Sequence, residues 1–225
     1  MTTISIPGFT DPFNSLSHLI GAVIFLFYGI KLIGMARGHR GWVTAVSVFV
    51  FSVVFLLSMS GVFHLLDNDS LARDVLRRLD HAAIFGLIAG TFTPVHVILF
   101  KGFARWGVLV LIWALAITGM TLKTIYFYEL PEGLGLMFYL GLGWVGIFSA
   151  YLTHKLHNFT VIKPLVYGAL AYTVGASLEF LKIPILIPGV IGPHELFHIA
   201  VLLGITYHWK FVTSLIILKR GEKIT

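Results

Sequence analysis

The chain has 225 residues, of which 57% are hydrophobic and 12% are charged, and its formal net charge is +6. A soluble domain of this size carries about twice that share of charged residues, so the composition excludes a soluble globular protein. Long apolar runs recur along the whole sequence, which predicts an all-α membrane protein with several spanning helices. The chain has no cysteine, and this excludes thiolate metal ligands.

Seven apolar segments are each close to the roughly 20 residues that a helix needs to cross a bilayer. We expect them to form a single seven-helix transmembrane domain over residues 1–225. The first 15 residues contain no Lys or Arg and two prolines, unlike a cleaved signal peptide, so the first segment should remain as a helix. The predicted spans lie near 16–35, 42–66, 79–100, 106–125, 134–152, 162–181 and 193–218.

The basic residues are distributed unevenly between the two sides of this predicted bundle. An odd number of spans places the chain ends on opposite sides; five Lys and Arg share the side of the N-terminus and eleven share the other. The positive-inside rule therefore predicts a cytoplasmic C-terminus and an extracytoplasmic N-terminus. The basic loops face anionic lipid on this interpretation, and they give no indication of nucleic-acid binding.

Ionisable residues inside spans are costly, which makes each of them a functional hypothesis. His64 lies near the end of the second predicted span, one turn after Ser60, and Asp80 lies at the start of the third. His194 and His198 open the seventh span at positions i and i+4, on one helical face. These three span ends face the same side of the membrane, the side of the N-terminus. Three imidazoles, a carboxylate and a hydroxyl can therefore converge at one depth.

Three histidine ligands with an open fourth position are typical of a catalytic zinc site, in which zinc activates a water molecule. We predict that His64, His194 and His198 bind zinc. Asp80 is then placed to act as general base, and Ser60 to bond the water, the substrate or the free nitrogen of a ligand ring. The alternative is a Ser–His–Asp hydrogen-bond network that holds three helices together without metal.

Four stretches of the sequence resemble the haemolysin III proteins and, more distantly, the adiponectin and progestin (PAQR) receptors. The resemblance implies a seven-helix bundle, zinc bound by His64, His194 and His198, and Asp80 with Ser60 around the bound water. It also implies kinship with the alkaline ceramidases, which cleave an amide bond in a membrane lipid. The receptors keep their N-terminus in the cytoplasm, whereas the charge count predicts the reverse here. The matching stretches are N-S-L-S-H at 14–18, S-x-x-x-H at 60–64, L-D-H-A at 79–82 with L-I-A-G-T-F-T-P at 87–94, and H-x-x-x-H at 194–198.

The same region also fits H-E-x-x-H, the metalloprotease signature in which the glutamate is the base. An intramembrane protease is less favoured, because nothing resembles the distal Asn-Pro-Asp-Gly-type segment of such enzymes and the other matches would be unexplained. Glu195 has a structural account as well, since an acid just after Pro193 suits a helix N-terminus. It remains a candidate base beside the metal.

Two further residues on this side of the predicted bundle have alternative roles. His18 opens the first span, where it either supports or gates the site or is simply solvated at the helix end. Glu179 ends the sixth span and either lines an entrance to the site or pairs with Lys182.

The sequence supports two main functions. The first is a zinc-dependent hydrolase that acts on an amide or ester of a membrane lipid, and the second is a receptor or regulator of membrane state with structural zinc. A pore-forming haemolysin is less favoured, because a conduction path needs polar residues through the full depth of the bundle, and here they gather on one side. No feature of the sequence indicates an oligomeric state.

Overall fold

The computed structural model describes residues 10–188 and 190–221, with the backbone alone at Glu132. This part of the chain forms eight α-helices and one isolated β-bridge between Ile187 and Ile191. The helices are α1 (Pro12–Met35), α2 (Arg40–Leu65), α3 (Leu71–Leu99), α4 (Phe103–Ile125), α5 (Glu132–Trp144), α6 (Gly146–Leu156), α7 (Phe159–Leu181) and α8 (Pro193–Lys219).

Seven helical segments in the described residues are long and apolar enough to cross a membrane. The segments α5 and α6 together make one of them, Gly133–Leu156, because the chain breaks only at Val145 between them. Gly141, Gly143 and Gly146 surround this break, and glycine weakens a helix. The prediction of an all-α, seven-span bundle is confirmed.

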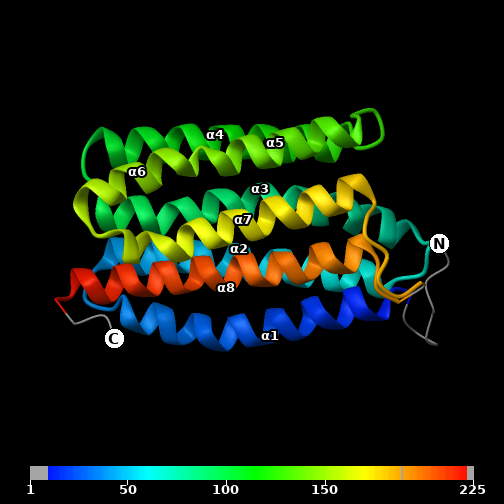
Figure 1. Ribbon diagram of the computed structural model, residues 1–225, viewed down its shortest axis with the longest axis horizontal. Helices are drawn as coiled ribbons and strands as arrows, with labels where there is room; N and C mark the ends of the chain where they lie inside the picture. Colours follow the sequence, from blue (N-terminus) through cyan, green and yellow to red (C-terminus); the bar gives the residue numbers. More distant parts are fainter. Residues whose placement is uncertain (1–9, 189, 222–225) are drawn as a thin grey trace.

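The helices run along the long axis of the bundle, with α3 at its centre (Figure 1). Helix α3 contacts α2, α4, α5, α6 and α8, and α7 packs along α8. The main apolar core lies between α1, α2, α3 and α8 and includes Phe49, Leu57 and Phe211. Outward faces carry large exposed apolar side chains such as Phe27 and Phe51, as contact with lipid requires.

Helix α3 begins earlier than the sequence predicted. We expected a connection up to Arg78, but the helix starts at Leu71, and Ser70 caps it by accepting a hydrogen bond from the backbone N–H of Arg73 at 3.2 Å. Asp74 and Arg78 form an i,i+4 ion pair at 3.3 Å within this extension. Hydropathy detects only the apolar part of a helix, so the charged first two turns were missed.

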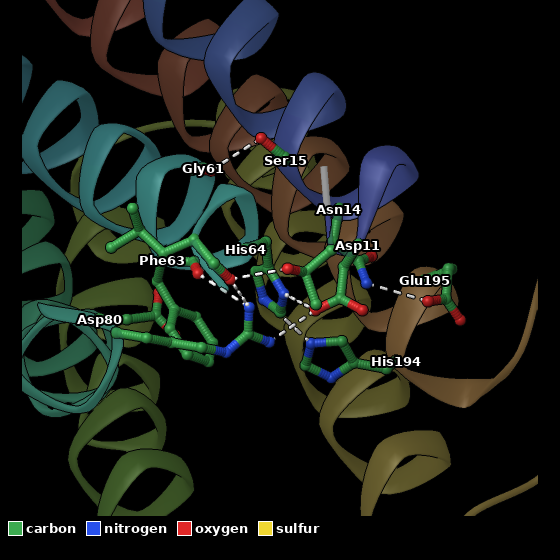
Figure 2. Close-up of polar contacts among 12 residues, drawn as sticks. Asp11, Asn14, Ser15, Gly61, Phe63, His64, Asp80, His194 and Glu195 are labelled. Carbon is green, nitrogen blue, oxygen red and sulfur yellow. Dashed lines mark hydrogen bonds and ion pairs between the residues drawn. The ribbon is translucent and has the colours of Figure 1, made fainter. Parts of the chain in front are cut away.

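The end of α2 and the beginnings of α1, α3 and α8 lie at the same end of the bundle (Figure 1). The hydroxyl of Ser15 on α1 donates to the carbonyl of Gly61 on α2 at 2.8 Å, which fixes these two helices against each other there (Figure 2). The predicted convergence of helix ends is therefore present, and it brings the polar residues of the spans together.

Helices α2 and α3 approach closely at Gly90, and this contact predicts a stability effect. A Cβ atom at Gly90 would lie 2.2 Å from Oγ and 2.7 Å from Cβ of Ser52. We expect Gly90→Ala to destabilise the protein by about 1–3 kcal/mol, because the two helices must move apart. Thermal unfolding in detergent measures the change. Gly86→Ala is the matched control one turn earlier, where the nearest atom is 3.9 Å away, and equal Tm values for the two variants would contradict this account.

The orientation inferred from the basic residues gives a second prediction. The chain termini themselves, residues 1–9 and 222–225, lie outside the described part of the structure. We expect alkaline phosphatase fused after Glu129, in the connection on the side of the histidines, to be active in a Gram-negative host, and the same enzyme fused after Thr225 to be inactive. Green fluorescent protein at the same two points should give the opposite pattern. Reversed signals would place the C-terminus outside.

Candidate metal centre

Three histidines meet where α2 ends and α8 begins. The ligand nitrogens of His64, His194 and His198 all lie within 4.8 Å of one another. Their ring centroids form a nearly equilateral triangle with sides of 4.8, 4.8 and 5.0 Å. His64 and His198 are buried, whereas the His194 side chain is 40% exposed. The structure therefore brings together all three residues that the sequence predicted as ligands.

The hydrogen bonds of two of these rings direct their Nε2 atoms toward each other. His64 Nδ1 lies 3.0 Å from Asp11 Oδ2, and His194 Nδ1 lies 3.1 Å from Glu179 Oε1. A neutral ring that donates Nδ1–H to a carboxylate carries a bare lone pair on Nε2. The two Nε2 atoms face each other at 3.2 Å (Figure 2).

Two imidazole nitrogens at this distance need a cation between them, either a proton on one of the rings or a metal ion that both bind. With Zn–N bonds of about 2.0–2.1 Å, two imidazoles on a tetrahedral zinc have nitrogens roughly 3.3 Å apart. Carboxylates behind metal-bound histidines are the usual arrangement, since they fix the tautomer and raise the basicity of the ring. The donor set therefore fits a divalent metal ion.

Asp11 precedes α1 and joins it to α2 and α3. Its carboxylate accepts from Arg73 Nη2 at 2.8 Å as well as from His64, and its N–H donates to the carbonyl of His64 at 3.0 Å. Burial favours the protonated acid, but the hydrogen bonds with His64 and Arg73 outweigh it and lower the pKa of Asp11 to about 2. The carboxylate therefore stays ionised at neutral pH and can hold the proton on His64 Nδ1.

Arg73 hydrogen-bonds to backbone carbonyls at the end of α2. It donates to the carbonyl of Phe63 at 3.3 Å and to that of Leu66, while its guanidinium lies over the Phe63 ring (Figure 2). Neither Asp11 nor Arg73 is among the site residues predicted from the sequence. An acid directly before Pro12, at a helix start on the side of the histidines, was the available signal for Asp11. Arg73 lay in a segment predicted to be a connection.

His18 packs against the third histidine of the cluster. Its ring stacks on His198 with centroids 3.9 Å apart and an interplanar angle of 22°. Its side chain is 3% exposed, so the alternative that His18 is solvated at the helix end is wrong. Within the described residues, both His18 nitrogens and His198 Nδ1 lack a hydrogen bond of normal geometry, although the main chain of Asn14 approaches His198. Stacking therefore sets the plane of the His198 ring.

Glu195 lies to one side of His64 and His194 and is hydrogen-bonded to neither ring (Figure 2). One carboxylate oxygen accepts from the N–H of Gly192 at 2.8 Å, and the other accepts from Asn14 Nδ2 at 2.9 Å. The side chain thus caps its own helix and attaches α8 to α1. This geometry favours the structural account of Glu195 over a role as base.

Asp80 lies on the opposite side of the histidines from Glu195 (Figure 2). It lines a cavity of about 740 Å³ together with His64 and His194. The buried hydroxyl of Ser60, which the sequence predicted to bond the water, the substrate or a ligand ring, lies near the Asp80 carboxylate in the structure.

The cavity extends from the histidines into the bundle. Residues of α2 to α8 form its walls, and most of these residues are apolar. Ile84, Leu87 and Ile88 of α3 and Leu140 and Ile147 of the α5–α6 span are among them. A chamber of this size and lining suits a hydrocarbon chain, and His64, His194 and Asp80 also line it.

We predict that the two carboxylates behind the ligands tune the affinity for metal. About one zinc ion per chain should bind to the purified wild type and be lost in His64→Ala, His194→Ala and His198→Ala. Asp11→Asn and Glu179→Gln should weaken zinc binding about 10- to 100-fold, because the rings lose their fixed tautomers. Competition with a chelating dye, together with mass spectrometry of metal content, measures both effects.

Glu195→Gln is the matched control for these carboxylates, because it removes a nearby acid that does not contact a ligand ring. Its zinc affinity should stay within a few-fold of the wild type. Zinc that survives all three histidine substitutions would disprove the site.

The comparisons with known proteins agree with this architecture. Residues 9–209 match the family model described as "Haemolysin-III related". The chain is 33% identical to "Hemolysin-3" of Bacillus cereus over 198 residues, which is 85% of this chain and 84% of that protein. It is 29% identical to "Hemolysin-3 homolog" of Bacillus subtilis (strain 168) over 171 residues, which is 75% of this chain and 79% of that protein. A match over most of the chain, to a seven-span bundle with a histidine cluster at one end, shows that this protein belongs to the haemolysin III family.

Proposed function

We propose that this membrane protein is a zinc-dependent hydrolase that cleaves an amide or ester bond of a membrane lipid. The observation that supports this most directly is the position of the histidine cluster at the polar end of the cavity. A purely structural zinc site is closed by a fourth protein ligand. Among the described residues, the cluster consists of three histidines, and Asp80 shares the cavity wall with two of them, His64 and His194.

In this proposal, the residues around the cluster have separate chemical roles. Zinc held by three imidazoles supplies a Lewis acid and an activated water as nucleophile. Asp80 takes up the proton of the nucleophile and returns it to the leaving group, as a general acid–base does. Ser60 holds the Asp80 carboxylate in place, and Asp11 and Glu179 hold the ligand rings in the required tautomer.

The apolar cavity positions the substrate in this proposal. A lipid whose carbonyl lies at the histidines places its hydrocarbon chain in the chamber below them, among side chains such as Leu87 and Ile88. Exclusion of bulk water by that chain strengthens the electrostatic interactions of Asp80 and the imidazoles. An acyl amide of the ceramide type, or an acyl ester, has the required shape.

A regulator with structural zinc is the second candidate. One observation favours it: contacts at the site join five helices, since Asp11 precedes α1, His64 ends α2, Arg73 belongs to α3, Glu179 ends α7 and His194 begins α8. A metal at this point would fix their relative positions without turnover. The site would then respond to lipid in the cavity by a change of helix packing.

Hydrolysis by the metal-loaded protein decides between these candidates. We expect release of fatty acid from at least one of ceramide, N-acyl amino acids or phospholipid acyl esters, measured by mass spectrometry in mixed micelles. Asp80→Asn should lower the rate about 10²- to 10⁴-fold and retain zinc, because it removes the proton acceptor but no ligand.

Asp74→Asn is the matched control on the same helix, since Asp74 pairs with Arg78 and does not line the cavity. It should keep the rate within a few-fold. No release from the whole panel by zinc-loaded wild type, or equal rates for wild type and Asp80→Asn, would reject the enzyme and leave the regulator.

A further inference from the structure

The connection between α7 and α8 has an apolar surface outside the spans. Its described part, residues 182–188 and 190–192, is called the α7–α8 turn below. Large apolar side chains are 40–57% exposed along this turn, namely Ile183, Ile185, Leu186, Ile187 and Val190. Single exposed apolar side chains are ordinary, but a contiguous patch of them indicates a surface that has a partner.

The other two connections at this end of the bundle are different (Figure 1). The connection from α2 to α3 carries Asp67 and Asp69, and the one from α4 to α5 carries Glu129. The α7–α8 turn contains no acid, and Lys182 is its one charged residue. Water suits the first two connections, whereas the third requires an apolar environment.

The backbone of the α7–α8 turn is largely paired within itself. The N–H groups of Leu186 and Ile187 both donate to the carbonyl of Ile191 at 3.0 Å. The carbonyl of Ile187 in turn accepts from Val190 at 3.0 Å and from Ile191 at 2.9 Å. Two prolines of the turn have no N–H to pair. Unpaired backbone groups are what exclude irregular segments from lipid, so this pairing makes the turn suited to an apolar environment.

The apolar surface continues the outward side of α7. Leu170, Val174 and Leu181 lie on one face of this helix and are exposed, as side chains in contact with lipid are. The turn follows directly after Leu181. Lys182 lies at this junction, where its long side chain can extend the ammonium group to the lipid head groups. The lipid that covers α7 can therefore also cover the turn.

We propose that the α7–α8 turn is an interfacial anchor that inserts into the lipid leaflet on the side of the histidine cluster. Its partner is the boundary between the head groups and the acyl chains. Phe180 and Lys182, where the turn begins, line the cavity, and so does His194, just after the turn ends. The anchor thus holds the histidine cluster near the depth at which acyl chains are linked to head groups. This consequence rests on the proposed function, whereas the insertion itself does not.

Single-cysteine variants in lipid nanodiscs test the insertion without turnover, since the chain has no cysteine of its own. An NBD fluorophore on Leu186→Cys is quenched either by iodide in the water or by a phospholipid with a nitroxide on its upper acyl chain. We expect the lipid nitroxide to quench it and iodide to quench it several-fold less than in the control. Asp69→Cys is the matched control, because it lies in a polar connection at the same end, and it should show the reverse.

Ile185→Asp combined with Val190→Asp should raise iodide quenching at the Leu186→Cys label toward the control value, because a carboxylate is costly in hydrocarbon. The Tm should stay unchanged, since both side chains are exposed. Unchanged quenching in this variant, or equal iodide quenching at the Leu186 and Asp69 positions, would overturn the anchor. Protection from iodide without quenching by the lipid nitroxide would also overturn it and assign the surface to a second protein chain. None of these readouts involves hydrolysis, so failure of the enzyme and failure of the anchor are distinguishable.

Discussion

The hydrogen bonds from Asp11 to His64 and from Glu179 to His194 determine what the polar end of this bundle can do. Each carboxylate can hold a proton on Nδ1 of its ring, and the two Nε2 atoms face each other at 3.2 Å. A metal ion bound by both nitrogens would give half of a tetrahedral ligand set. These two hydrogen bonds require four helix ends to lie close together: the start of α1, the end of α2, the end of α7 and the start of α8.

The membrane explains why the charged groups at this end of the bundle are paired within the protein. A charged or polar side chain in hydrocarbon must find its partner within the protein, because no water is available to replace it. Asp11 is shared by His64 and Arg73, and Glu195 divides its oxygens between Gly192 and Asn14. The neutral groups are paired less completely, since both nitrogens of His18 and Nδ1 of His198 have no hydrogen-bond partner among the described residues.

Under the proposed function, the cavity brings the substrate to the histidine cluster. Zinc held by the three histidines would polarise a carbonyl placed beside them, and Asp80 would take up the proton. The hydrocarbon chain would then lie among the apolar side chains of the chamber, such as Leu87 and Ile88.

The sequence by itself determined the membrane class, the seven spans and the three histidines, since hydropathy and the side of each helix end follow from the order of residues. It could not place Asp11, Arg73 and Glu179 against their partners, because those contacts join residues 53, 62 and 15 positions apart. Tertiary packing also decided that Ser60 lies beside Asp80, that Glu195 caps α8 and that His18 stacks on His198. Helical periodicity shows which residues of one helix lie on the same face. Only the packing of two helices decides which residues of the second helix that face contacts.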